Sequence, residues 1–197
     1  MNNVLILKKY IELSKTPSDI NEHLETLKKY AQECDIIVEM GVRSIVSTWA
    51  FLAANPKKLI SLDLYNPSRF GGNLQEVYDA ASFSDIDFSF VEQDSLSYNI
   101  DSCDLLFLDT WHDFLQLKKE LTRHHSKVNK YIVLHDTVSY EYVDEKSANE
   151  MGLLNDVETN LPKGLIASVD EFILKNPEWY IYERFANNNG ITILKKI

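Results

Sequence analysis

Short apolar runs alternate along this chain with longer stretches in which apolar residues recur at helical spacing. A short apolar run that closes in an acid is typical of a buried parallel strand. Runs of this kind lie at residues 36–40, 59–64, 88–94, 104–109 and 131–136. Helical spacing occurs between them, at residues 47–55, 73–82 and 112–128. Strands that alternate with helices predict a parallel sheet covered by helices on both faces.

The two ends of the chain depart from this alternation. Helical periodicity from Val4 to Leu13 is followed by Thr16-Pro17-Ser18-Asp19, which predicts a capping box and the start of a second helix. Near the C-terminus a helical stretch at 164–176 precedes two alternating runs, and the Asn-Gly between these runs predicts a β-hairpin. We therefore expect an α/β fold: a Rossmann-like three-layer sandwich with a mostly parallel seven-stranded sheet and a C-terminal antiparallel hairpin.

Length, charge and cysteine content narrow the class of protein. The 197 residues predict one domain over 1–197, with 1–34 as an N-terminal helical segment. A formal net charge of −10 argues against a non-specific nucleic-acid binder and against a binder of anionic membranes. The two cysteines, Cys34 and Cys103, are expected to be reduced thiols in or near the core. Because the N-terminus lacks signal-peptide order and no apolar run reaches transmembrane length, we expect a cytoplasmic protein.

The segment from Ile36 to Trp49 carries the sharpest motif. An apolar strand ends in Glu39, a turn follows at Gly41, and small and β-branched residues come next. This order is typical of the connection from a parallel strand to a helix at a ligand-binding crevice. The spacing is not the G-x-G-x-x-G dinucleotide fingerprint, since Gly41 is the only glycine in this segment. An NAD-linked oxidoreductase is therefore disfavoured.

The motif resembles motif I of the class I S-adenosylmethionine-dependent methyltransferases. The resemblance implies that the backbone near Gly41 cradles the methionine part of S-adenosylmethionine, with Glu39 as a hydrogen-bonding neighbour. Ser47 and Thr48 are candidate cofactor donors at the helix N-terminus, and helix capping is the alternative role for both. Relatives usually carry a further glycine where this chain has Arg43-Ser44-Ile45.

Nearly every predicted strand ends in an acid. Because the carboxyl ends of parallel strands meet at one edge, these acids predict an acidic rim that binds hydroxyls, amines or a hard cation. They are Glu39, Asp63, Asp94, Asp109 and Asp136. The resemblance implies that Asp63 binds the ribose hydroxyls, that Asp94 and Ser95 lie beside the adenine, and that Asp109 also belongs to the cofactor site. The alternative is that the acids are solvated loop starts and helix caps.

Two further pairs, Asp109 with His112 and His135 with Asp136, follow neighbouring predicted strands and are expected to converge at the opening of one site. They resemble motifs of small-molecule and sugar O-methyltransferases of the cephalosporin-hydroxylase-like and related families. The resemblance implies Asp109, His135 and Asp136 as ligands of Mg²⁺ or Mn²⁺, of which Mn²⁺ tolerates a histidine better. We expect His112, His135 and Asp136 to be catalytic, with His112 as the base. The structural alternatives are packing of His112 on Trp111 and a buried His135 satisfied by the backbone.

The sequence therefore predicts an S-adenosylmethionine-dependent O-methyltransferase acting on a hydroxyl of a sugar or glycan. The nearest enzymatic alternative is a catechol-type or other small-molecule O-methyltransferase. A non-catalytic methyltransferase-like binding module is the alternative from another class, supported by the missing second glycine. The expected partner is a small-molecule or glycan acceptor, without nucleic acid or membrane, and a homodimer is left open.

Overall fold

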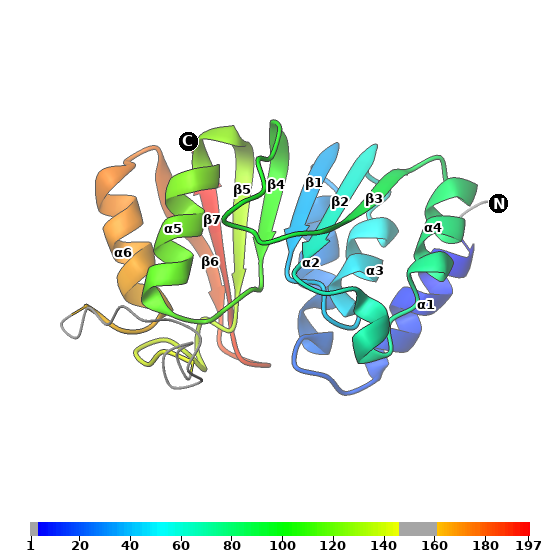
Figure 1. Cartoon of the computed structure of the whole chain (residues 1–197), viewed down its shortest axis with the longest axis horizontal. Coiled ribbons are helices and arrows are strands. Elements are labelled where there is room, and N and C mark those ends of the chain that lie inside the picture. Colours follow the sequence, from blue (N-terminus) through cyan, green and yellow to red (C-terminus); the bar gives the residue numbers. More distant parts are fainter. Residues whose placement is uncertain (1–3, 146–160) are drawn as a thin grey trace.

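One seven-stranded sheet forms the centre of the structure, a computed structural model that describes residues 4–145 and 161–197 (Figure 1). The strands run in the order β3-β2-β1-β4-β5-β7-β6. Their bounds are β1 Ile36–Met40, β2 Lys58–Asp63, β3 Asp87–Glu92, β4 Cys103–Leu108, β5 Val128–His135, β6 Trp179–Phe185 and β7 Ile191–Lys196. Strands β1 to β5 pair in parallel, whereas β7 is antiparallel to β5 and to β6. The predicted parallel sheet and C-terminal hairpin are both confirmed.

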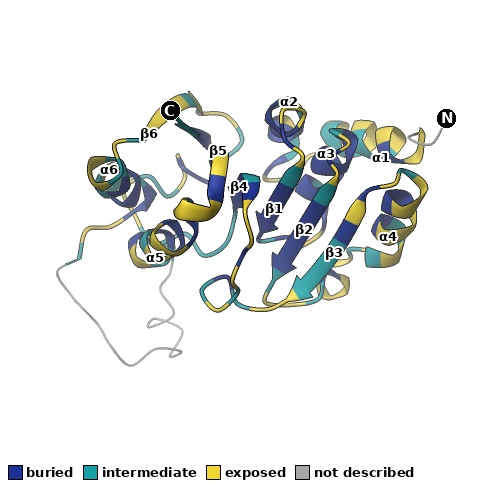
Figure 2. Ribbon diagram, turned by 90° about the horizontal axis from the view of Figure 1, so that it is seen from above, coloured by how far each residue is buried: buried dark blue, intermediate teal, exposed yellow. Residues whose placement is uncertain are grey.

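Helices cover both faces of this sheet, as the alternating pattern predicts. They are α1 Val4–Lys15, α2 Leu24–Ala31, α3 Val46–Ala53, α4 Leu74–Phe83, α5 Phe114–His124 and α6 Leu165–Lys175, with short 3₁₀ turns at Asn21–His23, Pro67–Phe70 and His125–Lys127. Helices α1, α2, α3 and α4 cover one face of the sheet, and α5 and α6 cover the other (Figure 1). Each group of helices packs on its face through a separate apolar cluster. Figure 2 shows the buried residues gathered on the central strands and on the inward sides of the helices. The expected three layers are therefore present.

The capping box expected at Thr16-Pro17-Ser18-Asp19 does not start a helix. The hydroxyl of Thr16 donates to the carbonyl of Glu12, 2.9 Å away, and so remains engaged with the end of α1. The Ser18 N–H donates to Oδ1 of Asn21 at 2.9 Å, which closes a turn, and α2 begins only at Leu24. The prediction failed because these side chains hydrogen-bond to the preceding helix and to their own turn.

Strand β5 begins at Val128, earlier than the apolar run at 131–136 indicates. Val128 pairs with Cys103 of β4, and the register shifts between this pair and the next one, Leu105 with Tyr131. The two residues that follow it are exposed and polar, which hides the start of the strand in the sequence. No helix in the described ranges is both long enough and apolar enough to cross a membrane.

Candidate functional site

The candidate site lies where the strand order reverses, between β1 and β4. In open α/β sheets this switch point opens a crevice at the carboxyl ends of the strands. Gly41, directly after β1, has a φ of +88°, and a Cβ built on it would lie 1.9 Å from the backbone oxygen of Asp109. The Asp109 N–H donates to the carbonyl of Met40 at 2.8 Å. The ends of β1 and β4 are therefore in direct backbone contact, and only glycine fits at the turn.

Asp63 anchors the turn after β1. Its Oδ2 accepts hydrogen bonds from the backbone N–H groups of Val42 at 2.8 Å and Arg43 at 2.9 Å, and its Oδ1 accepts one from Tyr65 N–H at 3.0 Å. A carboxylate that receives successive backbone N–H groups fixes their conformation. The resemblance assigns this acid to the ribose hydroxyls, and that role stays a prediction.

Ile45 stands near the position where relatives carry their second glycine. It has a φ of +69°, in the left-handed region, and immediately precedes α3. The side chain is buried, and a Cβ built at Gly72 would lie 2.8 Å from its Cδ1 atom. A β-branched residue in this conformation is strained by roughly 1–2 kcal/mol. The turn thus keeps a backbone that suits glycine while its isoleucine packs on the loop after β2.

Glu39, Ser47 and Thr48 are brought together, but with their polar atoms turned toward one another. The fully buried carboxylate of Glu39 accepts hydrogen bonds from Ser47 Oγ at 2.5 Å, from Thr48 Oγ1 at 2.8 Å and from Ser61 Oγ at 2.5 Å. Burial raises the pKa of Glu39 to about 7, although the three hydroxyls oppose the shift. Sequence reasoning missed Ser61, whose signal is a lone hydroxyl inside the apolar run of β2. A direct contact of these side chains with the cofactor stays a prediction.

Asp94 and Ser95 also have internal partners. The carboxylate of Asp94 accepts from the Leu96 N–H at 3.0 Å and from the Ser97 hydroxyl at 3.1 Å, and so caps its own turn. Ser95 is buried and donates to Glu120 of α5 at 2.6 Å. Glu120 was not among the predicted site residues. It is a buried acid, and its burial raises its pKa. The expected contact of Asp94 and Ser95 with adenine remains a prediction.

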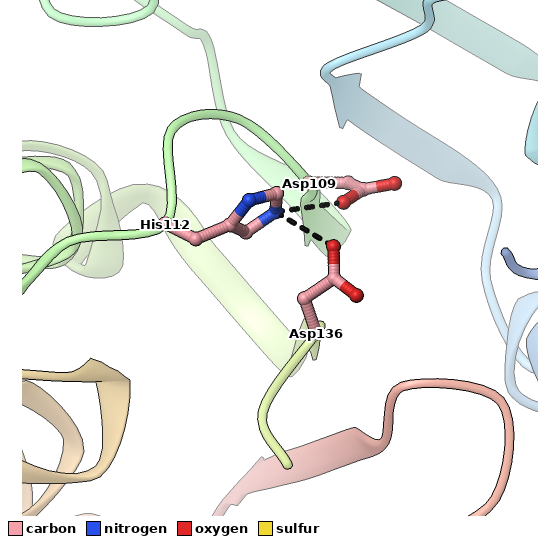
Figure 3. A group of neighbouring side chains, drawn as sticks. All are labelled: Asp109, His112 and Asp136. Carbon is pink, nitrogen blue, oxygen red and sulfur yellow. Dashed lines mark hydrogen bonds and ion pairs between the residues drawn. The ribbon is translucent and has the colours of Figure 1, made fainter. Parts of the chain in front are cut away.

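Two histidines and two aspartates converge at the ends of β4 and β5, as the paired motifs predict. Figure 3 shows three of them, Asp109, His112 and Asp136. His112 Nε2 lies 3.3 Å from Asp109 Oδ1 and 3.0 Å from Asp136 Oδ2. His135 Nδ1 lies 3.2 Å from the same oxygen of Asp109 and 3.6 Å from that of Asp136. Its Nε2 donates to the carbonyl of Asn188 at 3.3 Å, so His135 is also satisfied in part by the backbone.

The charges in this cluster stabilise one another. Burial lowers the pKa of His112, but its hydrogen bonds to Asp109, Asp136 and Glu145 outweigh this effect and raise the pKa to about 12. The pKa of Asp109 is lowered despite its burial, because both histidines carry positive charge beside it. In this state His112 is an imidazolium that holds a proton on each nitrogen. The imidazolium form does not itself accept a proton, and the expected role of His112 as the base stays a prediction.

The cluster fits a divalent cation. Ligand atoms of Asp109, His112 and Asp136 all lie within 4.8 Å of one another. The sequence-based set contained His135 in place of His112. Nδ1 of His135 also lies 3.2 Å from Oδ1 of Asp109, so its role as a ligand stays a prediction. Oδ1 of Asp136 is buried without a hydrogen-bond partner, and the backbone of Asp136 has a φ of +57°. Two carboxylates with an imidazole suit Mn²⁺ better than Mg²⁺.

No protein-family model and no curated protein matches this sequence. Similar solved structures do exist. An O-methyltransferase from Bacillus cereus in complex with SAH is 12% identical, with a TM-score of 0.64 over 98% of this chain and 90% of that one. TomG from Streptomyces achromogenes, an O-methyltransferase involved in tomaymycin synthesis and solved with SAM, is 12% identical, with a TM-score of 0.63 over 100% and 91%.

A third similar structure is named for a protein substrate and not as an O-methyltransferase. It is a ribosomal protein L11 methylase from Lactobacillus delbrueckii, 11% identical with a TM-score of 0.54 over 88% of this chain and 79% of that one. The shared fold therefore does not decide which acceptor is methylated. The sheet order, the helical layers and these likenesses together show that this chain has the fold of the class I methyltransferases.

Proposed function

We propose that this chain transfers a methyl group from S-adenosylmethionine to a hydroxyl of a small molecule, with a sugar or glycan as the acceptor. The observation that carries the proposal is the contact between the turn at Gly41 and the backbone of Asp109. It places the turn expected to hold the cofactor directly beside the cluster of Asp109, His112, His135 and Asp136. Methyl transfer requires this adjacency, because the acceptor oxygen must reach the methyl carbon in line with its bond to sulfur.

The cofactor would supply a methyl group bound to a positively charged sulfur. Transfer would form the oxygen–carbon bond as the carbon–sulfur bond breaks. It would release S-adenosylhomocysteine and the hydroxyl proton. The carboxylate of Asp136, whose Oδ1 has no hydrogen-bond partner, can receive this proton, and that of Asp109 can hydrogen-bond to the hydroxyl. A cation held by Asp109, His112 and Asp136 would lower the pKa of the hydroxyl and neutralise the acids in place of the imidazolium. Both routes use the buried cluster, where charges interact more strongly than in water.

The sugar or glycan acceptor rests on the resemblance of the aspartate-x-x-histidine and histidine-aspartate pairs. The catechol-type alternative uses the same cluster and differs in the acceptor. Two observations favour the non-catalytic module: Ile45 fills the turn where relatives carry glycine, and Asp63 is bound to backbone N–H groups. A binding measurement separates that module from the enzyme.

The test is a calorimetric titration of S-adenosylmethionine and S-adenosylhomocysteine into the wild type, Asp63→Ala and Asp79→Ala. Asp63→Ala removes the acceptor of three backbone N–H groups, so we expect affinity to fall by about 10- to 100-fold. Asp79→Ala is the matched control, because Asp79 is an exposed acid of α4 that accepts from Gln75. Absence of binding to the folded wild type would refute the enzymatic proposal and favour the module.

If the cofactor binds, transfer of a labelled methyl group to sugar and catechol acceptors should be measured with Mn²⁺ and with a chelator. Methylation of a sugar hydroxyl is the expected outcome. Methylation of catechols alone would replace the sugar proposal with the catechol-type alternative. Equal activity in chelator and in Mn²⁺ would show that the cluster works without a cation.

A further inference from the structure

Glu145 reaches the candidate site from the segment that follows β5. Its Oε2 lies 2.9 Å from Nδ1 of His112 and also accepts from the backbone N–H of His112 at 3.4 Å. In return, the backbone N–H of Glu145 donates to the carbonyl of His112 at 2.8 Å. The two residues are therefore held together at both the backbone and the side chain, although they are 33 positions apart in sequence.

We infer that Glu145 is a positioning residue that fixes which nitrogen of His112 faces Asp109 and Asp136. The inference rests on the proposed function, because it assigns Glu145 to the same cluster. A neutral imidazole carries its proton on one nitrogen and a lone pair on the other. Without a cation both nitrogens of His112 hold a proton. When a cation displaces one of these protons, the carboxylate beside Nδ1 keeps the other one there, which leaves the Nε2 lone pair pointing between the two aspartates. A cation bound by His112, Asp109 and Asp136 requires that tautomer.

Without Glu145, a ring that has lost one proton to a bound cation would favour the opposite tautomer. The two aspartates would then draw the single proton of a neutral ring to Nε2, and the lone pair would lie on Nδ1, away from them. The ring could also turn about its side-chain bonds. Glu145 thus decides both the orientation of the ring and the position of its lone pair.

Neighbouring contacts hold Glu145 in place. Oδ1 of Asp144 accepts from the backbone N–H groups of Phe114 at 3.0 Å and Gly164 at 2.8 Å, which ties the segment to the start of α5 and to the residue before α6. The ring of Tyr140 stacks on His112 with centroids 4.8 Å apart and an interplanar angle of 4°. His112 is therefore confined by a stacked ring on one face and by carboxylates at both nitrogens.

The experiment compares the wild type with Glu145→Ala, Glu145→Gln and Glu141→Ala. Glu141→Ala is the matched control, because it removes a carboxylate of the same segment that pairs with Arg184 at 2.9 Å. The first readout is the nuclear magnetic resonance signal of the proton on His112 Nδ1 in the metal-free, ¹⁵N-histidine-labelled protein. We expect a slowly exchanging signal in the wild type and in Glu141→Ala. In Glu145→Ala the Nδ1 proton loses its acceptor and exchanges with water, so its signal should be lost. In Glu145→Gln the signal should be retained at a shifted position, because the amide oxygen can still accept.

The second readout is the affinity for Mn²⁺. We expect Glu145→Ala to bind Mn²⁺ about 10- to 100-fold more weakly than the wild type, and Glu141→Ala to bind it equally well. Persistence of the Nδ1 proton signal in Glu145→Ala would overturn the inference, and so would loss of the signal with unchanged Mn²⁺ affinity. If the wild type binds no Mn²⁺, the cation is removed from the proposed function, and the proton signal alone decides the role of Glu145.

Discussion

Replacing Gly41 by alanine tests whether the turn at the candidate site is closed by backbone contact. The glycine has a φ of +88°, and a Cβ at this position would lie 1.9 Å from the oxygen and 2.4 Å from the carbon of the Asp109 carbonyl. Such distances lie far inside van der Waals contact, and the atoms met are backbone atoms that cannot rotate away. Either the end of β1 or the end of β4 must therefore move.

Gly71→Ala provides a control for the backbone conformation alone. Gly71 has a φ of +83°, close to that of Gly41, but a Cβ built on it meets nothing within 4 Å. A left-handed conformation costs an alanine about 1–2 kcal/mol, of which the lower entropy of the unfolded chain returns about 0.4–1 kcal/mol. We therefore expect Gly71→Ala to lose about 1 kcal/mol of unfolding free energy. Gly41→Ala should lose a further 1–3 kcal/mol, roughly, for overpacking, or more if the strands cannot separate.

The assay is urea unfolding of the two variants and the wild type, followed by circular dichroism, with the slope of each transition compared. Because the overlap would displace Asp109, Gly41→Ala should also weaken Mn²⁺ binding, whereas Gly71→Ala should not. Equal loss of stability in the two variants would refute the close approach of Gly41 to Asp109.

Two further predictions concern buried residues around the same turn. Burial raises the folded-state pKa of Glu39 from 4.5 to about 7, so the folded protein binds this proton more tightly than the unfolded chain does. The unfolding free energy of the wild type should therefore fall by about 3 kcal/mol in total as pH rises through that window. Glu39→Gln does not titrate there, so its unfolding free energy, measured in urea at pH 5 and pH 8, should fall less than that of the wild type, and an identical fall would contradict the burial of this carboxylate. Ile45→Gly should lose about 2–5 kcal/mol of buried packing and regain about 1–2 kcal/mol from the left-handed backbone, for a net loss of about 1–3 kcal/mol. A net gain in urea unfolding would show that Ile45 is strained beyond what its packing on Gly72 offsets.

The order of the elements follows from the sequence because it depends on local periodicity and on turn chemistry. The run at 36–40 matches β1 in the structure, and Asn-Gly at 189–190 lies in the hairpin turn as predicted. The prediction failed at Thr16, whose hydroxyl bonds back to the preceding helix. A short polar stretch offers several local hydrogen-bonding arrangements, and the sequence alone does not rank them.

The gathering of acids and histidines at one edge of the sheet also followed from the sequence, since parallel strands bring their carboxyl ends together. What the sequence could not give is the partner of each group. That Asp63 accepts from the turn after β1, and that Glu39 accepts from Ser61, depends on which strands are neighbours. That Glu145 reaches His112 depends on the path of the chain after β5. Periodicity is fixed by contacts a few residues apart, whereas hydrogen-bond partners and burial are fixed by contacts across the sheet, and only the tertiary structure decides these.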